Sequence, residues 1–490
     1  MLKAISLLLI LVIAVTFLAG CQENSADVAN DEKSGNTGVN LNETTSGNYE
    51  SEIEYLDLGG YEISFVVRGG TGGYASFYCI DLFSEGYNGD LINDAVYERN
   101  LFLEEKYNFK IKQTYAEHPT FPSDVLRNSV LAQEDVYDVA YDSLSMTMPM
   151  AGEQMLTDIY TLPYINFSKP YWYENVNEDL SIGNKLYMTY GEHMLSVNAG
   201  LYGVFFNKQI ADDFNIENLY DAVRNNKWTI EKYYNLCKDI AYDYNGDGIM
   251  DYHDFWGTQT QMHNAYTFFI ASGEKIVSKD ENDYPVLSLN NPRAINVLEL
   301  TGDFLMDTNT TMQVNSWPQD VWGYIGSIFK EERSLFVEGA IMQAPAMRNW
   351  DFDFGILPNP KYEENQDRYY HTPSVWNTSL LAVPATITNP DKIGYILEIL
   401  AAKSVDTLTP TYYDLQLTNK VMRDDESGKM LDIMFSSVAF DIGAAYDFGG
   451  MFNVVLNVGT KAANFASAYA AAEGNAQKAI DKLIETLEGE

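Results

Sequence analysis

The sequence predicts an α/β fold in which strands and helices alternate along the chain. Short segments with β-branched and aromatic residues at alternate positions are each followed by a segment with apolar residues at helical spacing. Several helical segments also begin with a residue type that caps helices. This alternation is typical of a mainly parallel sheet that is covered by helices.

The predicted elements follow one another without an internal repeat of solenoid length. Asn291-Pro292 and Asn389-Pro390 each place a capping residue before a proline, which is favourable at the first helical position. Near the C-terminus, Ala, Ile and Leu recur at helical spacing. Strands are predicted at 61–67, 109–113 and 136–141, and helices at 90–107, 124–133, 230–240, from 291, at 389–400 and at 479–487.

The N-terminus has the composition of a secretory signal. Lys3 precedes an apolar run from Ala4 to Leu18, which is shorter than the roughly 20 residues that span a bilayer. The following Ala19-Gly20-Cys21 completes a segment that resembles the lipobox of bacterial lipoproteins. That resemblance implies a signal peptide at 1–20, a diacylglycerol on Cys21 and anchoring at the extracytoplasmic face of the cell membrane. The alternative is an ordinary signal peptide with an incidental cysteine.

The segment after Cys21 is polar in composition. Residues 22–49 are rich in Asn, Ser, Gly, Thr, Asp and Glu, which predicts a flexible linker over 21–55.

The whole chain is 46% hydrophobic and can build a large core, and its net charge is −39. Such acidity argues against nucleic acid or an anionic membrane surface as a partner. Cys79 and Cys237 can form at most one disulfide, and we expect them to be isolated apolar residues.

Eight segments of the mature chain resemble the large lipoprotein solute-binding proteins of ABC importers (family 1 type). Their order and spacing carry the resemblance more than any one of them does. The segments are 91–100, 104–108, 134–139, 158–162, 180–187, 203–208, 336–340 and 354–358.

The resemblance implies a two-lobe, periplasmic-binding-protein-like fold of type II, with a hinge and an interlobe cleft. Lobe 1 would comprise 56–188 and 370–430, and lobe 2 would comprise 189–369 and 431–490. It further implies a non-enzymatic protein that captures a sugar or oligosaccharide and presents it to an ABC permease. Periodicity alone does not require two lobes.

Residues 243–254 match the calcium-loop pattern through its first nine positions. Oxygen side chains stand at loop positions one, three, five and nine, and Gly248 stands at position six, where the chain turns sharply. Asp254 occupies the twelfth position, where a bidentate glutamate is usual. We therefore predict one structural Ca²⁺ site, with a solvated Asx/Gly turn as the alternative. The predicted ligands are Asp243, Asn245, Asp247, the Ile249 carbonyl, Asp251 and Asp254.

Aromatic residues are the main candidates for ligand recognition. They make up 13% of the chain, and flat rings pack on the apolar faces of sugars while polar groups orient the hydroxyls. The predicted strand 136–141 ends at Tyr141, where open α/β sheets place their ligands. The resemblance points to Trp350 as a stacking ring that is faced by Tyr446 or Phe452. The full candidate set is Tyr141, Asp142, His263, Tyr266, Arg348, Trp350, Trp376, Tyr446 and Phe452.

Two other functions remain open at this point. A surface carbohydrate-active hydrolase would need two facing carboxylates, which the sequence offers in excess without identifying a pair. A lipoprotein that presents its ligand to a membrane kinase would have the same sequence features as a transport protein. The five histidines show no zinc-ligand spacing, and the chain has no Gly-x-Ser-x-Gly elbow or phosphate loop.

Overall fold

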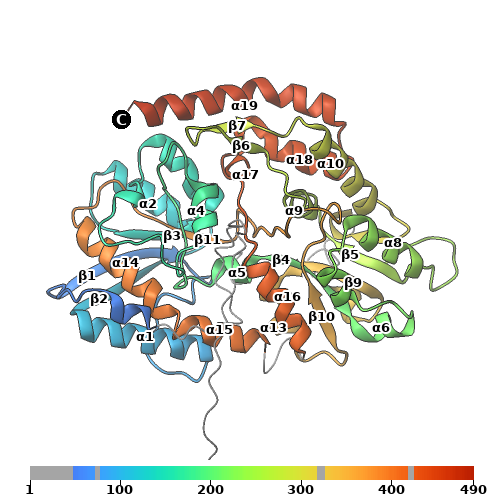
Figure 1. The fold of residues 1–490 in the computed structure, drawn as a ribbon, viewed down its shortest axis with the longest axis horizontal. Helices are drawn as coiled ribbons and strands as arrows, with labels where there is room; N and C mark the ends of the chain where they lie inside the picture. The colour runs from blue at the N-terminus through green and yellow to red at the C-terminus, as the bar shows by residue number, and fades with distance from the viewer. Residues whose placement is uncertain (1–47, 72–77, 317–325, 418–423, 490) are drawn as a thin grey trace, which may run out of the picture. The chain divides into compact units, whose positions relative to one another are not determined.

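The structure is a computed structural model that describes residues 48–71, 78–316, 326–417 and 424–489. The predicted signal peptide, Cys21 and most of the predicted linker lie outside the described residues. The described chain builds two separate main sheets, each with its own helices (Figure 1). No helix among the described residues is both long and apolar enough to cross a membrane.

The first sheet has the strand order β11-β3-β1-β2. Strand β1 pairs in parallel with β2 and β3, and β11 is antiparallel to β3. The chain therefore begins with the predicted strand–helix alternation and completes the sheet with a strand from much later in the sequence. The strands are β1 (Tyr61–Arg68), β2 (Phe109–Ala116), β3 (Val139–Ser143) and β11 (Ser379–Ala382).

Local sequence explains the helices around the first sheet. The Asp90 side chain caps α1 by accepting from the Ile92 and Asn93 amides, and Asn108 ends it in the left-handed conformation. Helix α2 packs on β1, β2 and β3, whereas α1 packs against α14 and α15. These helices are α1 (Leu91–Tyr107), α2 (Pro122–Leu131), α14 (Pro390–Ser404) and α15 (Leu408–Leu417).

The second sheet is mixed, with the order β10-β4-β9-β5-β8. Strand β4 is antiparallel to β10 and β9, and β5 is parallel to β9 and β8. The prediction of a mainly parallel sheet is thus confirmed for the first sheet and wrong for the second. The strands are β4 (Tyr202–Asn207), β5 (Trp256–Thr260), β8 (Thr311–Gln313), β9 (Ser334–Ala340) and β10 (Phe354–Leu357).

Helices with buried apolar faces cover the second sheet. Helix α8 packs on β5, α16 on β10 and α12 on β9, while α10 contacts α8, α9 and α18. Asn291 caps α10 through the Ala294 amide, as the Asn-Pro pattern predicts. The helices are α6 (Lys208–Asp213), α7 (Leu219–Arg224), α8 (Ile230–Ile240), α9 (Asn264–Ala271), α10 (Pro292–Leu305), α12 (Ser327–Lys330), α13 (Ala344–Met347), α16 (Asp425–Phe435) and α18 (Met451–Gly459).

Short elements and one long helix complete the described chain. The predicted final helix is longer than expected and runs from Phe465 to Glu488 as α19. A small antiparallel hairpin stands between α9 and α10. The remaining elements are β6 (Val277–Lys279), β7 (Pro285–Leu287), α3 (Leu144–Thr147), α4 (Glu174–Leu180), α5 (Ser196–Gly200), α17 (Ile442–Tyr446), η1 (Tyr49–Glu52), η3 (Met148–Glu153), η4 (Ile159–Thr161), η5 (Val314–Ser316), η6 (Ile341–Gln343) and η7 (Phe448–Gly450).

The packed chain starts earlier than we predicted. Glu50 in η1 is buried, contacts the Tyr107 hydroxyl and lies 2.6 Å from Lys106 Nζ. Tyr49–Glu52 therefore belongs to the folded part, although it lies within the segment 21–55 that we predicted to be a linker. Composition did not reveal this because the segment is held by tertiary contacts, which include the ring of Tyr49 against Tyr171 and the ion pair of Glu52 with Lys169.

Three connecting segments between the sheets lie side by side. Leu201 bridges to Pro373, and His371 bridges to Val438. The buried His371 ring accepts from the Asn359 amide at 2.9 Å, and its Nδ1 lies 2.8 Å from Ser437 Oγ. Burial lowers the pKa of His371 to about 3, so this imidazole is neutral at physiological pH. The connections between the two sheets are therefore held by uncharged hydrogen bonds.

Both cysteines in the described chain are free thiols, and Cys237 is buried. Cys237 therefore fits the expected isolated apolar residue, whereas Cys79 is only partly buried. Trp172 and Trp228 are also buried and belong to the core.

Candidate functional site

Five rings from distant parts of the sequence form one contact group, which we call the aromatic cluster: Tyr202, His263, Tyr266, Trp376 and Phe452. The His263 ring lies 5.2 Å from Tyr202, 5.7 Å from Tyr266 and 5.9 Å from Trp376. Phe452 lies 4.9 Å from Tyr266 and 4.7 Å from Trp376, perpendicular to the indole. Four of the predicted ligand residues therefore meet here: His263, Tyr266, Trp376 and Phe452.

Different elements bring the rings of the cluster together. Tyr202 is the first residue of β4, His263 precedes α9, and Phe452 lies in the first turn of α18. Trp376 comes from the connection between β10 and β11, so its backbone leads into the first sheet. The other four rings come from elements of the second sheet and its helices. The cluster thus joins the two halves of the described chain.

Trp376 is the accessible ring of the cluster. It is 38% exposed, whereas Tyr266 and Phe452 are buried. The perpendicular Phe452 ring supports the indole, and aromatic pairs favour this edge-to-face geometry. A rigidly supported, exposed indole is a surface on which a sugar ring can stack.

His263 gives the cluster a polar edge. Its Nε2 is buried and has no hydrogen-bond partner among the described residues. Burial lowers the pKa of His263 to about 4, so the ring is neutral at physiological pH. A buried ring nitrogen without a partner costs free energy, which a ligand hydroxyl or a water molecule would recover.

A short hydrogen-bond network fixes the same edge. Gln261 Nε2 donates to the Tyr202 hydroxyl at 3.2 Å, and the backbone N–H of Gln261 donates to Asn264 Oδ1 at 2.8 Å. Asn315 Oδ1 accepts from the Met262 amide at 2.7 Å. Burial raises the pKa of Tyr202 to about 12, although the bond from Gln261 opposes the shift. Tyr202 and Gln261 were absent from the predicted set because Tyr202 precedes the segment 203–208 that carries the resemblance, and Gln261 follows β5, a strand that the sequence analysis did not predict.

Tyr141 and Asp142 support the site and do not form its surface. Both are buried, and the Tyr141 ring packs 5.5 Å from Phe65 inside the first sheet. Asp142 forms a buried ion pair with Arg68 at 3.0 Å. Our expectation that they contact ligand directly was based on a strand ending at Tyr141, whereas β3 runs from Val139 to Ser143 and buries both side chains in this conformation.

The remaining predicted residues lie in other packing groups. The Trp350 ring packs 6.0 Å from Phe329 and 5.6 Å from Phe352 and is partly buried, while Arg348 is exposed. Tyr446 stacks on Phe448 at 5.0 Å, and its buried hydroxyl has no hydrogen-bond partner among the described residues. Trp376 is exposed and belongs to the aromatic cluster, whereas Trp350 is partly buried, so the stacking role that we predicted for Trp350 fits Trp376 better.

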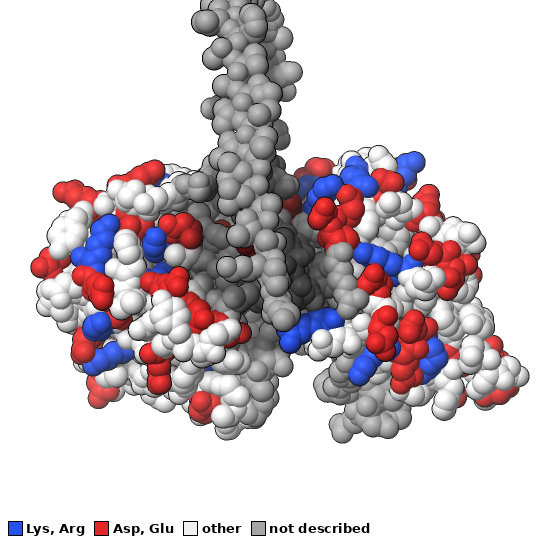
Figure 2. Space-filling model, turned by 90° about the horizontal axis from the view of Figure 1, so that it is seen from below, with Lys and Arg blue, Asp and Glu red and all other residues white. Residues whose placement is uncertain are grey.

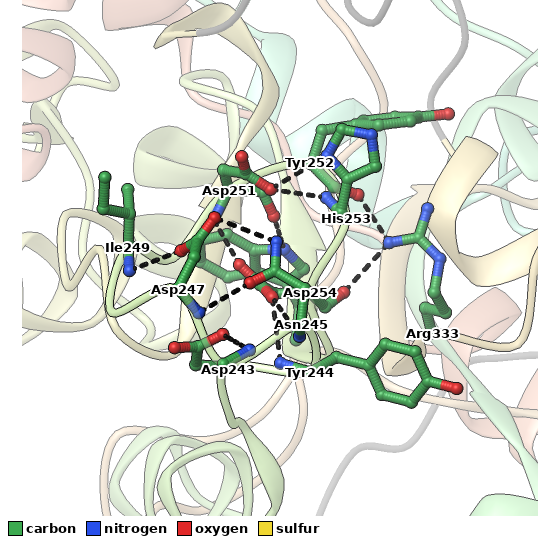
Figure 3. A network of polar contacts seen from close by, with 12 residues as sticks. Asp243, Tyr244, Asn245, Asp247, Ile249, Asp251, Tyr252, His253, Asp254 and Arg333 are labelled. Atoms are coloured by element: carbon green, nitrogen blue, oxygen red, sulfur yellow. Dashed lines mark hydrogen bonds and ion pairs between the residues drawn. The ribbon is translucent and has the colours of Figure 1, made fainter.

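The predicted ion loop is a tight turn that its own side chains close (Figure 3). Asp243 accepts from the amides of Gly246 and Gly248, at 2.6 Å and 2.7 Å. Gly248 has φ of +85°, a left-handed conformation that favours the glycine predicted at position six. Asp254 is buried and accepts from the Tyr244 amide at 2.9 Å and the Asp251 amide at 2.6 Å. It therefore ties the two ends of the loop together.

The residue types of this loop fit a calcium site. The arrangement of their side chains in this structure fits such a site less well. Asp243, Asn245, Asp247 and Asp251 supply the oxygen ligands that calcium prefers. Within the described residues, however, no three His, Cys, Asp or Glu side chains are grouped so as to hold a metal ion. Arg333 Nη1 also donates to the Asp254 carbonyl at 3.0 Å, which places a cation next to the loop (Figure 3).

Acidic side chains are spread over the described parts of the face in Figure 2, with Lys and Arg side chains among them. Several basic groups form ion pairs, such as Lys110 with Glu104 at 2.6 Å and Lys169 with Glu52 at 2.8 Å. Exposed pairs of this kind contribute about 0–1 kcal/mol each and keep the surface soluble.

The fold of the chain is similar to that of several solved structures. No protein-family model matches the chain, and no curated protein matches it in sequence. Among solved structures, it is similar to an ABC substrate-binding protein from Listeria monocytogenes in complex with cycloalternan, with 13% identity, a TM-score of 0.52, and coverage of 86% of this chain and 99% of that one.

Two further structures give the same result. A cyclo/maltodextrin-binding protein complexed with maltotetraose has 11% identity and a TM-score of 0.55 over 86% of this chain and 97% of that one. The galacto-N-biose/lacto-N-biose I-binding protein of a Bifidobacterium longum ABC transporter has 12% identity and a TM-score of 0.53 over 87% of this chain and 98% of that one. These similarities confirm the predicted α/β, two-lobe fold of type II.

Proposed function

We propose that this chain is an extracellular solute-binding protein that captures a sugar or oligosaccharide for an ABC permease. The observation that carries the proposal is the aromatic cluster, in which an exposed indole and a neutral histidine meet where the two halves of the chain join. The similar solved structures support it, since their bound compounds are cycloalternan, maltotetraose and lacto-N-biose.

The proposed mechanism is capture by both halves of the chain. A ligand stacked on Trp376 would also reach His263 and Tyr202, which come from the second-sheet side. Only a conformation that offers contacts from both sides is stabilised by such a ligand. The permease would then distinguish the liganded form by its shape, and no covalent chemistry is required.

A thermal-shift screen against a broad panel of sugars tests this function. A ligand that binds only the folded chain stabilises it by about 2.7 kcal/mol at a concentration of 100 Kd. We expect one or more oligosaccharides to raise the melting temperature, with the sugar recovered intact. Cleavage of the sugar would instead support a hydrolase.

We also propose that Cys21 carries the lipid anchor that holds the protein at the outer face of the membrane. Its support is the segment Leu18-Ala19-Gly20-Cys21, which resembles a lipobox. A diacylglycerol carries two acyl chains, and two or more acyl chains give stable anchoring. Cys21→Ala should abolish labelling by an alkyne-tagged fatty acid and release the protein from membranes or leave it unprocessed. Gln22→Ala is the control and should remain labelled. Equal labelling of Cys21→Ala and the parent protein would contradict the anchor.

We further propose that the loop 243–254 binds Ca²⁺ as a structural ion. Its support is the set of oxygen side chains at loop positions one, three, five and nine and the left-handed Gly248 at position six. Ca²⁺ should raise the melting temperature relative to a chelator, and Asp247→Ala should remove most of that difference. Asp239→Ala, at an exposed position of α8, is the control and should retain it. Identical melting curves with Ca²⁺ and chelator would contradict the ion.

A further inference from the structure

A buried ion pair lies at the ends of two neighbouring strands in the first sheet. Arg68 at the end of β1 and Asp142 in β3 are 1% and 0% exposed. Asp142 Oδ1 accepts from Arg68 Nε at 3.1 Å and from Nη2 at 3.0 Å. The carboxylate also accepts from the Ser123 amide at 2.9 Å and the Ser143 amide at 2.7 Å. Its position is therefore fixed by the backbone of the first sheet and α2.

The other side of the same guanidinium holds the segment that carries the exposed indole. Arg68 Nη2 donates to the Trp376 carbonyl at 2.8 Å, and Nη1 donates to the Asn377 carbonyl at 3.0 Å. The planar guanidinium has several donors in a fixed geometry, so it can serve a carboxylate and two carbonyls together. A lysine has a single ammonium group and cannot reproduce that arrangement.

We propose that Arg68, fixed by Asp142, is a positioning residue for the ligand site and sets the orientation of the Trp376 ring. The inference rests on the proposed sugar-binding function and deepens it. Arg68 fixes the backbone at Trp376 and Asn377, while His263 and Phe452 contact the ring itself. Arg68 thus affects affinity through Trp376 and not through contact with the sugar.

The burial of the Arg68–Asp142 ion pair decides which substitution is informative. Two charges that leave water incur a desolvation cost, which a simple apolar pair would avoid. Loss of Arg68 alone would leave Asp142 charged and buried, which itself destabilises the fold. The informative change is therefore the double variant Arg68→Met/Asp142→Asn, which removes both charges and keeps similar side-chain volumes.

The first measurement needs no sugar. Acrylamide quenching is recorded for the parent protein and for the double variant, each with and without Trp376→Phe, so that the difference isolates the Trp376 emission. We expect the quenching constant of Trp376 to change at least twofold in the double variant, with Arg68→Lys in between. Lys112→Met, which breaks an exposed pair with Glu62 on neighbouring strands, should leave it unchanged. An unchanged constant in the double variant would overturn the proposal.

The second measurement is a double-mutant cycle on the panel sugar that gives the largest thermal shift. The double variant should lose tenfold or more in affinity in the parent background and less than twofold in the Trp376→Ala background, because the two changes act through one ring. Equal losses in both backgrounds would overturn the positioning role. If no sugar binds at all, the proposed function fails, while the quenching experiment still decides the role of Arg68.

Discussion

Trp376→Ala is expected to weaken binding of the best panel sugar tenfold or more and to leave the fold intact. Stacking contributes the apolar area of the indole together with specific geometry of about 0.5–1.5 kcal/mol, and 1.4 kcal/mol is a tenfold change in affinity. The ring is 38% exposed, so its removal opens little of the core. Trp376→Phe keeps a smaller ring and should lose less affinity.

Trp350→Ala is the matched comparison because Trp350 was our sequence-based choice for the stacking ring. Its indole packs on Phe329 and Phe352 and is partly buried, so its removal should lower the melting temperature more and the affinity less. Calorimetry and thermal melting on both variants separate the two roles. Full affinity in Trp376→Ala together with a large loss in Trp350→Ala would return the site to the position that we predicted from the sequence.

Glu338→Gln is expected to stabilise the protein at neutral and alkaline pH. Glu338 lies in β9, in the middle of the second sheet, and is fully buried. Both of its carboxylate oxygens lack a hydrogen-bond partner among the described residues, and burial raises the pKa of the carboxyl well above the usual value. The Tyr233 hydroxyl lies 2.7 Å from Thr258 Oγ1.

The direction of the pH effect follows from the raised pKa. Between the unfolded pKa near 4.5 and the higher folded pKa, the folded chain holds a proton on Glu338 that the unfolded chain has lost. The stability that this proton provides is complete below pH 4.5 and is lost as the pH rises through the folded pKa. The loss is about 1.4 kcal/mol per pH unit within that window.

Urea unfolding at several pH values measures this effect. The stability of Glu338→Gln relative to the parent should grow as the pH rises above about 4.5. Glu299→Gln, at an exposed position of α10, is the control and should follow the parent at every pH. Parallel curves for Glu338→Gln and the parent would show that Glu338 keeps an ordinary pKa in the folded chain.

The elements that the sequence predicted well carry their own local signals. Helices α1, α10 and α14 are directly preceded by Asp90, Asn291 and Asn389, where a capping residue or an Asn-Pro pair marks the boundary. By contrast, β8 and β11 contain three and four residues. Strands of that length are too short to show periodicity, and they exist because neighbouring strands pair with them.

The site was predicted in part. His263, Tyr266, Trp376 and Phe452 were among the candidates, yet their mutual contact depends on three chain connections that no local pattern describes. Arg68 was not among the candidates, because its role depends on carbonyl groups more than 300 positions away. Tertiary contacts of this kind leave no signal in a single sequence.

Calorimetric titration of the chain that follows Cys21 with the best panel sugar tests the central claim most directly. The account predicts saturable binding at one site per chain, tenfold or greater weakening in Trp376→Ala, and recovery of the sugar unchanged. Failure of every sugar in the panel to bind, or release of cleaved sugar during the titration, would contradict it.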